Sequence, residues 1–205
     1  FQAAGQPYQR AKLVLFRDAV ASGCGQASSA TGPFYCPLDQ QVYIDLGFFD
    51  QLSQRFQAPG DFAQAYVIAH EIGHHLQRQL GIEQEVRAKS EENPDDANEL
   101  SIRLELQADC FAGVWGRSTY DRGILESGDL DEGLSAASAV GDDRIQEQAQ
   151  GRIDPESWTH GSAEQRSRWL QTGFDSGQLE SCDTFSADDA ADLVIEHLRR
   201  LGNIA

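Results

Sequence analysis

Residues 70–74 read His-Glu-Ile-Gly-His, a pattern that can hold a metal ion and activate water. Two histidines four positions apart lie on one face of a helix, so His70 and His74 can reach the same ion. Glu71 lies about 100° around the helix axis from His70, where it flanks the ion without binding it. In this H-E-x-x-H arrangement the glutamate is a general base that polarises a zinc-bound water. The alternative for so short a motif is an ordinary helix with exposed histidines.

A third ligand is needed, because a catalytic zinc ion has three protein ligands and one open position. Glu105 and Asp109 lie four residues apart on a second predicted helix. Their neighbours from Leu104 to Trp115 are mostly apolar, and carboxylates are rare in such surroundings unless they are paired or bound to metal. We therefore expect Glu105 to bind zinc and Asp109 to accept a hydrogen bond from a ligating histidine. The alternative is a solvated helix face that carries both carboxylates.

The two helices that position these residues are predicted from the spacing of apolar side chains. Apolar residues from Phe62 to Leu80 suit a largely buried helix, with Asp61 as a credible N-cap. Gly81 is typical of a helix C-terminus. The second helix is expected over residues 97–116.

Shorter elements are expected around these two helices. Residues 40–46 alternate apolar and polar side chains, which predicts a half-buried strand. Ser162 and Gln165 form a capping-box pattern at the start of another helix. Further helices are expected over residues 8–22, 134–145 and 186–201, and loops over residues 23–39 and 88–99. We predict a mainly α (α+β) fold, in a single domain over residues 1–205, with a small sheet or short edge strand.

The composition excludes several functions. The formal net charge of -17 makes nucleic-acid binding unfavourable, because such binding depends on neutralising phosphates with Lys and Arg. No apolar run approaches the roughly 20 residues that cross a membrane. The sequence contains no methionine, so we expect that an upstream segment has been removed, with a signal peptide or membrane anchor as the natural candidate.

The four cysteines, Cys24, Cys36, Cys110 and Cys182, fit a disulfide framework with three available pairings. Cys24 and Cys36 flank a loop rich in Gly and Ser, which suggests a local bridge and leaves Cys110 to pair with Cys182. The alternative is four buried free thiols in a cytosolic protein. Disulfides would indicate an oxidising, extracytoplasmic location: secreted, periplasmic or at the cell surface.

The pattern from His70 to His74, followed by Glu105-x-Gln107-Ala108-Asp109, resembles the gluzincin-type metallopeptidases, including the CaaX prenyl-protease group. More closely, several segments are similar to the bacterial family of putative neutral zinc metallopeptidases. These segments are residues 32–37, 42–45, 70–77, 108–115 and 159–169. The resemblance implies a zincin-like helical domain, a Zn²⁺ cofactor, peptidase activity and, in many members, an N-terminal membrane anchor.

Three further residues are expected to contact a substrate. His160 lies in a Thr-His-Gly-Ser turn just before a predicted helix, and we expect it to be a catalytic donor to an oxyanion. Its alternative is a surface or capping histidine. Tyr43 and Ile44 belong to the 40–46 strand, which would bind a peptide backbone by β-augmentation if it formed the edge of a sheet. The alternative for the strand is a place in a small sheet that covers the active-site helix.

Three functions fit these residues. The first is an active zinc-dependent endopeptidase that acts on peptides or proteins. The second is a catalytically silent binding or scaffold module at the cell surface. Glu71 and all the expected ligands are present, which favours the enzyme. A degenerate enzyme would be expected to have lost Glu71 or a ligand. The third, a structural zinc protein, is disfavoured because structural sites are usually closed by four Cys or His ligands.

Overall fold

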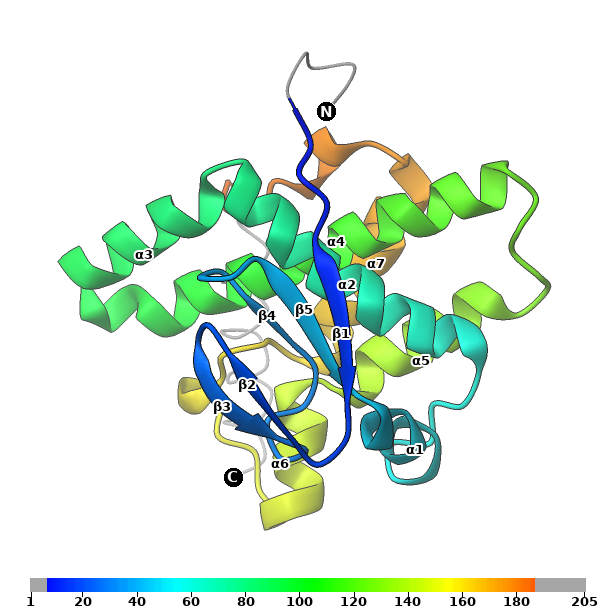
Figure 1. Cartoon of the computed structure of the whole chain (residues 1–205), viewed down its shortest axis with the longest axis horizontal. Coiled ribbons are helices and arrows are strands. Elements are labelled where there is room, and N and C mark those ends of the chain that lie inside the picture. Colours follow the sequence, from blue (N-terminus) through cyan, green and yellow to red (C-terminus); the bar gives the residue numbers. More distant parts are fainter. Residues whose placement is uncertain (1–6, 187–205) are drawn as a thin grey trace, which may run out of the picture.

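The computed structural model describes residues 7–186, and helices make up most of it (Figure 1). The α-helices are α1 (Leu46–Gln54), α2 (Asp61–Gln79), α3 (Ile82–Glu92), α4 (Ala97–Asp121), α5 (Asp129–Ala139), α6 (Asp142–Gln150) and α7 (Ala163–Ser176). Short 3-10 turns form η1 (Pro94–Asp96), η2 (Pro155–Ser157) and η3 (Leu179–Cys182). The predicted mainly α fold with a small β component is confirmed. The helix expected over residues 186–201 lies almost wholly outside the described residues.

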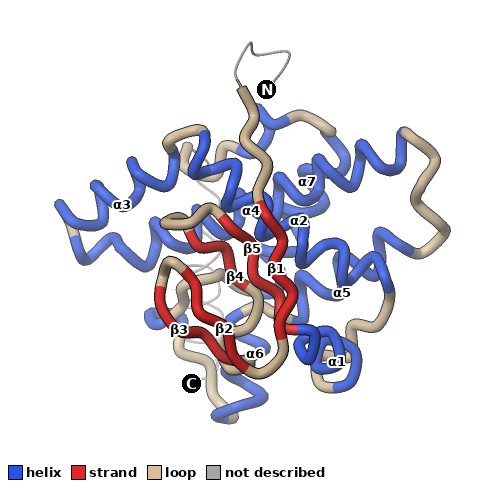
Figure 2. Tube along the Cα trace, in the orientation of Figure 1, coloured by secondary structure: helices blue, strands red, loops and turns tan. Residues whose placement is uncertain are grey.

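Two small sheets lie together on one side of the helices (Figure 2). The strands are β1 (Lys12–Phe16), β2 (Ala19–Ser22), β3 (Gly25–Ser28), β4 (Phe34–Cys36) and β5 (Gln41–Asp45). Three of them form a sheet in the order β1-β5-β4, in which β5 is parallel to β1 and antiparallel to β4. The other two form an antiparallel hairpin. The larger sheet packs against α2 through β4 and β5.

The strand predicted over residues 40–46 forms as β5, but its expected edge position is wrong. It lies between β1 and β4, and all of its residues from Val42 to Asp45 are buried. Leu46 already belongs to α1. The order of strands depends on residues far apart in the sequence, and a period-two pattern does not encode that order.

The helix predicted over residues 8–22 is also wrong, because this segment forms β1 and β2. Along β1, Leu13 and Leu15 remain exposed while Phe16 is buried. Backbone pairing with β5 along the full length of β1 holds the strand in place. Apolar residues at such positions suit either a helix or an edge strand, so periodicity alone does not decide between them.

Helix α2 packs against the sheet and also against α4 and α5. Gly73 allows its close approach to α4, because a Cβ at this position would lie 3.0 Å from the Cα and the carbonyl oxygen of Ala108. Gly113 and Gly173 bring α4 and α7 into direct backbone contact in the same way. These close approaches let polar side chains from the three helices meet in the interior.

The segment over residues 88–99, predicted as a loop, is helical in its first part. Helix α3 continues to Glu92 and carries exposed i,i+4 ion pairs, Arg87 with Glu91 and Lys89 with Glu85. Such pairs stabilise an exposed helix that has few apolar residues. The high polarity of this segment therefore reflects a solvent-exposed helix.

Two further helix boundaries differ from the sequence pattern, and one agrees with it. The helix predicted over residues 134–145 is divided into α5 and α6 at Gly141. Gly60, rather than Asp61, is the N-cap of α2. The capping box of Ser162 with Gln165 at the start of α7 is confirmed.

Two disulfides join distant parts of the fold. Cys24–Cys36 links the β2–β3 turn to β4, and Cys110–Cys182 links α4 to η3. This is the pairing that the order of the cysteines suggests. Disulfides persist in oxidising compartments, so both bridges are typical of an extracytoplasmic protein. Within residues 7–186, no helix has both the length and the apolar character needed to cross a membrane.

Candidate metal centre

Helices α2 and α4 bring the three predicted ligands together. The Nε2 atoms of His70 and His74 lie 3.2 Å apart. The Glu105 carboxylate approaches the His70 Nε2 to 3.1 Å and the His74 Nε2 to 3.3 Å. One ligand atom from each of the three residues lies within 4.8 Å of the other two. The three side chains therefore converge on one point, and their binding of a metal stays a prediction.

The outer nitrogens of both imidazoles face hydrogen-bond acceptors. The Nδ1 of His70 lies 2.8 Å from an oxygen of Asp109, and the Nδ1 of His74 lies 2.8 Å from the side-chain oxygen of Gln77. Each Nδ1 therefore donates, and the Nε2 lone pairs point toward one another and toward Glu105. Three acceptors this close together need a positive charge among them. Protons can supply it, and so can a divalent cation that displaces them.

The pKa values of these groups reflect the same need for positive charge. Burial lowers the pKa of His70, but the carboxylates of Asp109 and Glu105 outweigh burial and raise it to about 10. Burial raises the pKa of Glu105, yet the two imidazoles bring it well below its ordinary value. Two imidazoles and one carboxylate form a donor set that suits catalytic zinc. Because zinc competes with protons for these ligands, its affinity is expected to fall as the pH falls.

A fully buried carboxylate, Asp109, lies behind His70. It accepts hydrogen bonds from Tyr66 Oη at 2.6 Å, from His70 Nδ1 at 2.8 Å, and from Nε of Arg166 at 2.8 Å. Burial raises the pKa of Asp109, but the Arg166 guanidinium and His70 bring it to about 2. Asp109 is therefore ionised, and its hydrogen bond with Nδ1 of His70 leaves Nε2 as the nitrogen that faces His74 and Glu105.

Sequence reasoning did not identify Arg166 as part of this site. The residue lies on α7 and is only 4% exposed. A fixed charge in such a position needs a buried partner, and Asp109 lies 57 residues away in the sequence. An arginine close to Trp169 and Leu170 on a predicted helix is the available signal, but it does not reveal the partner.

Glu71 lies beside the ligands with its carboxylate unpaired. Its side chain is buried and lines the same cavity as the histidines. Within residues 7–186, no N–H or O–H group donates a hydrogen bond to it. Burial raises the pKa of Glu71 above its ordinary value. A carboxylate that is buried, free of donors and raised in pKa is suited to accept a proton from a bound molecule.

A cavity of about 550 Å³ opens next to the three candidate ligands and Glu71. One wall is formed by Phe34 and Tyr35 of β4. Another wall is apolar and includes Phe48 of α1, Phe56 and Val67. Apolar walls around a few convergent polar groups are typical of a ligand-binding pocket.

His160 also lines the cavity, from the loop that precedes α7. One oxygen of Asp142 accepts hydrogen bonds from the backbone N–H groups of Thr159, His160 and Gly161. Its other oxygen lies 3.1 Å from His160 Nδ1. This hydrogen bond raises the pKa of His160. The structure thus brings His160 to the cavity, and its part in a reaction stays a prediction.

The two residues predicted to bind substrate, Tyr43 and Ile44, do not reach the cavity. Both are buried in the central strand β5, and the Tyr43 hydroxyl donates to Asp39. The expectation of substrate contacts from these two residues depended on an edge position that β5 does not have. The strand that lines the cavity at the edge of the sheet is β4.

Comparison with known proteins gives one family and several curated relatives. The sequence profile of the family described as putative neutral zinc metallopeptidase matches residues 1–185. The uncharacterized protein YpfJ of Escherichia coli (strain K12) is 55% identical over 187 residues, which cover 90% of this chain and 65% of YpfJ. The uncharacterized protein Rv2575 of Mycobacterium tuberculosis (strain ATCC 25618 / H37Rv) is 47% identical over 193 residues, covering 89% of this chain and 64% of Rv2575. The chain therefore spans slightly less than two thirds of the length of these relatives. No solved structure matches it significantly.

Proposed function

We propose that this chain, which belongs to the putative neutral zinc metallopeptidase family, is a zinc-dependent endopeptidase. His70, His74 and Glu105 would hold the ion, and Glu71 would be the general base. The observation that carries the proposal is the convergence of three ligand atoms beside the buried Glu71 carboxylate, which receives no hydrogen bond from the residues that the structure describes. A purely structural metal site does not need a carboxylate beside the ion to accept a proton.

Each of these groups would have a separate role in peptide hydrolysis. When bound, zinc supplies a Lewis acid that polarises the scissile carbonyl and lowers the pKa of a water. Glu71 takes a proton from the attacking water and passes it to the leaving amine. Asp109 keeps the proton of His70 on Nδ1, so that Nε2 remains a ligand.

The free edge of β4 is the proposed place for the substrate backbone. Strand β4 pairs with β5 on one side, and no described strand pairs with its other side. Phe34 and Tyr35 place this strand along the wall of the cavity. An extended peptide can add to such an edge through main-chain hydrogen bonds, with alternate side chains entering pockets. We propose peptides or proteins as substrates, and an oxidising compartment outside the cytoplasm as the place of action.

The role of His160 leads to a prediction about pH. Because its Nδ1 donates to Asp142, its Nε2 carries a second hydrogen only in the cationic form, and kcat should fall as pH rises through its raised pKa. The Asp142→Asn variant should therefore move this alkaline limb of the kcat profile to lower pH. His160→Ala should lower kcat by about 100-fold with little change in KM. An unchanged profile in Asp142→Asn, with kcat of His160→Ala near wild type, would rule out the donor role.

The test of the proposed function is the Glu105→Ala variant. Removal of one of three ligands should leave the purified protein without bound zinc and without cleavage of a broad peptide library. Zinc content measured by elemental analysis, together with the library assay, gives both results. Glu91→Ala, which removes an exposed carboxylate of α3, is the matched control and should behave as wild type.

Two results would count against the proposal. Zinc bound as tightly by Glu105→Ala as by wild type would show that Glu105 is not a ligand. Wild-type protein that binds zinc but cleaves no member of the library would favour the silent binding module instead.

A further inference from the structure

The Gln77 side chain lies between His74 and helix α4. Its amide oxygen accepts from Nδ1 of His74 at 2.8 Å, and its amide nitrogen donates to the carbonyl oxygen of Leu104 at 2.6 Å. The same nitrogen lies 3.2 Å from the side-chain oxygen of Gln107. Gln77 is fully buried, so each of these groups depends on the others for its hydrogen bonds.

This arrangement fixes the direction of the Gln77 amide. The Leu104 carbonyl accepts only, so the nitrogen must face it and the oxygen must face His74. His74 Nδ1 must then carry the hydrogen, which leaves the Nε2 lone pair for a metal. Gln77 therefore has the same relation to His74 that Asp109 has to His70.

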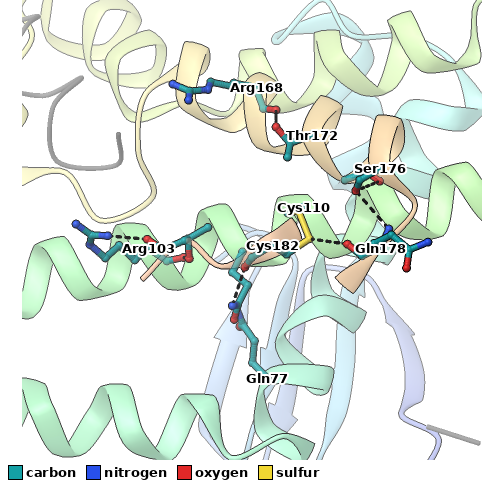
Figure 3. The surroundings of a disulfide bond; sticks show 11 residues. Gln77, Arg103, Cys110, Arg168, Thr172, Ser176, Gln178 and Cys182 are labelled. Carbon is teal, nitrogen blue, oxygen red and sulfur yellow. Dashed lines mark hydrogen bonds between the residues drawn. A yellow bond between two sulfur atoms is a disulfide. The ribbon is translucent and has the colours of Figure 1, made fainter. Parts of the chain in front are cut away.

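The hydrogen bonds continue from Gln77 to the Cys110–Cys182 disulfide. The amide nitrogen of Gln107 donates to the carbonyl oxygen of Cys182 at 3.0 Å. Cys182 is bonded to Cys110, one turn further along α4 than Gln107. In Figure 3, Gln77 points from its helix toward this disulfide.

We propose that Gln77 is the positioning residue of His74, and that the hydrogen bonds through Gln107 and Cys182 make metal affinity depend on the Cys110–Cys182 disulfide. The inference rests on the proposed zinc site and adds its regulation. When the disulfide is formed, the Cys182 carbonyl accepts a hydrogen bond from Gln107, and the Gln107 side-chain oxygen accepts one from Gln77. Gln77 in turn accepts the hydrogen bond that orients the candidate ligand His74. Reduction removes the covalent link between Cys182 and α4, which leaves the segment attached through noncovalent contacts such as the hydrogen bonds between Thr184 and Arg103, and this loosens the same series of contacts. The site would thus bind zinc more tightly in an oxidising compartment than in a reducing one.

The first experiment compares Gln77→Met with Gln77→Glu in the full chain. Methionine removes the acceptor of His74 Nδ1, and zinc affinity, measured by competition with a chelator, should fall by about 10–100-fold. Glutamate keeps an acceptor for Nδ1 and should bind zinc more tightly than the methionine variant. The absorption spectrum of bound Co²⁺ should change in Gln77→Met, because the imidazole is no longer held in place. Gln84→Met, on α3, is the matched control and should bind zinc as wild type does.

If Gln77 merely joined the two helices, the order of zinc affinities of the two variants would be reversed, with Gln77→Glu binding more weakly than Gln77→Met. The carboxylate of Gln77→Glu would face the Leu104 carbonyl and the Gln107 oxygen, which is worse for packing than methionine. Zinc affinity that is lower in Gln77→Glu than in Gln77→Met would overturn the positioning role. So would wild-type affinity in Gln77→Met.

The second experiment tests the link to the disulfide. Gln107→Leu keeps the disulfide but removes the hydrogen bonds that the Gln107 side chain makes with Gln77 and with Cys182. The double variant Cys110→Ala/Cys182→Ala removes the disulfide itself. Each should weaken zinc binding by about tenfold, and the triple variant should bind no more weakly than the weaker of the two. Circular dichroism identifies the variants that fold. If the double cysteine variant fails to fold, the comparison is made on oxidised and mildly reduced protein, wild type against Gln107→Leu.

The control for the disulfide is the other bridge. The double variant Cys24→Ala/Cys36→Ala removes a disulfide with no hydrogen bond to the ligands or to Gln77 and should keep wild-type zinc affinity. The link between the disulfide and the zinc site would be overturned if the losses of zinc affinity were fully additive in the triple variant. It would also be overturned if reduction lowered zinc affinity equally in wild type and in Gln107→Leu. Absence of zinc binding by wild type would overturn the proposed function instead, so the two failures are distinguishable.

Discussion

Replacing Glu71 with glutamine is expected to lower kcat by about 10²–10⁴-fold while zinc content stays at the wild-type level. Glutamine has almost the same shape as glutamate but cannot accept the proton of the attacking water. The wild-type carboxylate is buried and receives no hydrogen bond from residues 7–186, and its pKa is raised by burial. It is therefore held ready for proton transfer. Single-turnover cleavage of a peptide identified from the library, with elemental analysis of the same sample, measures both quantities.

The control for this prediction is Glu83→Gln. Glu83 also lines the cavity, but its carboxylate is paired with Arg78 at 3.0 Å. Because its carboxylate is paired with Arg78 and makes no hydrogen bond or ion pair with His70, His74 or Glu105, its loss should leave kcat within a few-fold of wild type. A Glu71→Gln variant that retains more than a tenth of wild-type kcat would show that another group takes the proton. Loss of zinc from that variant would mean that Glu71 contributes to metal binding.

The two ligand helices could be predicted from the sequence because their signals are local. The apolar spacing of residues 62–80, the ends of the helix and the H-E-x-x-H motif all lie within one segment. The pairing of His70 and His74 on one face then follows from helix geometry alone. The position of Glu105 opposite them needed one further assumption, that the two helices pack closely. Gly73 against Ala108 supplies that contact.

Asp109 could be predicted as a supporting residue, but Arg166 and Gln77 could not. Arg166 comes from α7 and its contact with Asp109 spans 57 residues. Gln77 lies only three residues from His74, but the direction of its amide is set by the Leu104 carbonyl, 27 residues away. The same reason explains the misplaced substrate strand. A pattern of alternating residues identifies β5 as a strand, but only its pairing with β1 and β4 decides which strand lies at the edge.

The second large effect is expected for the buried pair of Asp109 and Arg166. The Asp109→Leu variant should lose about 3–5 kcal/mol of the free energy of unfolding, because it leaves the Arg166 guanidinium buried without its partner. Arg166→Leu should cost less, because Asp109 keeps its contacts with the Tyr66 hydroxyl and with His70. The double variant should be less destabilised than the sum of the two, since no uncompensated charge remains. Denaturant unfolding of the oxidised, zinc-free protein measures all three. Asp121→Ala, which breaks the exposed pair with Arg117 on the same helix, should cost less than about 1 kcal/mol.

The pH dependence of Asp109→Asn tests the charge of this pair separately from its packing. The pKa of Asp109 is lowered from 3.8 to about 2 in the folded protein, so the stability that its charge provides is fully present above pH 4. That stability is lost as the pH falls toward 2, because the folded carboxylate then becomes protonated. Asp109→Asn should therefore be much less stable than wild type at pH 7, and the difference should narrow between pH 4 and pH 2. A difference that stays constant over this range would mean that Asp109 acts through its shape and hydrogen bonds rather than its charge. Asp109 would then be a neutral partner of His70, and the raised pKa of the His70 imidazole would have to come from Glu105.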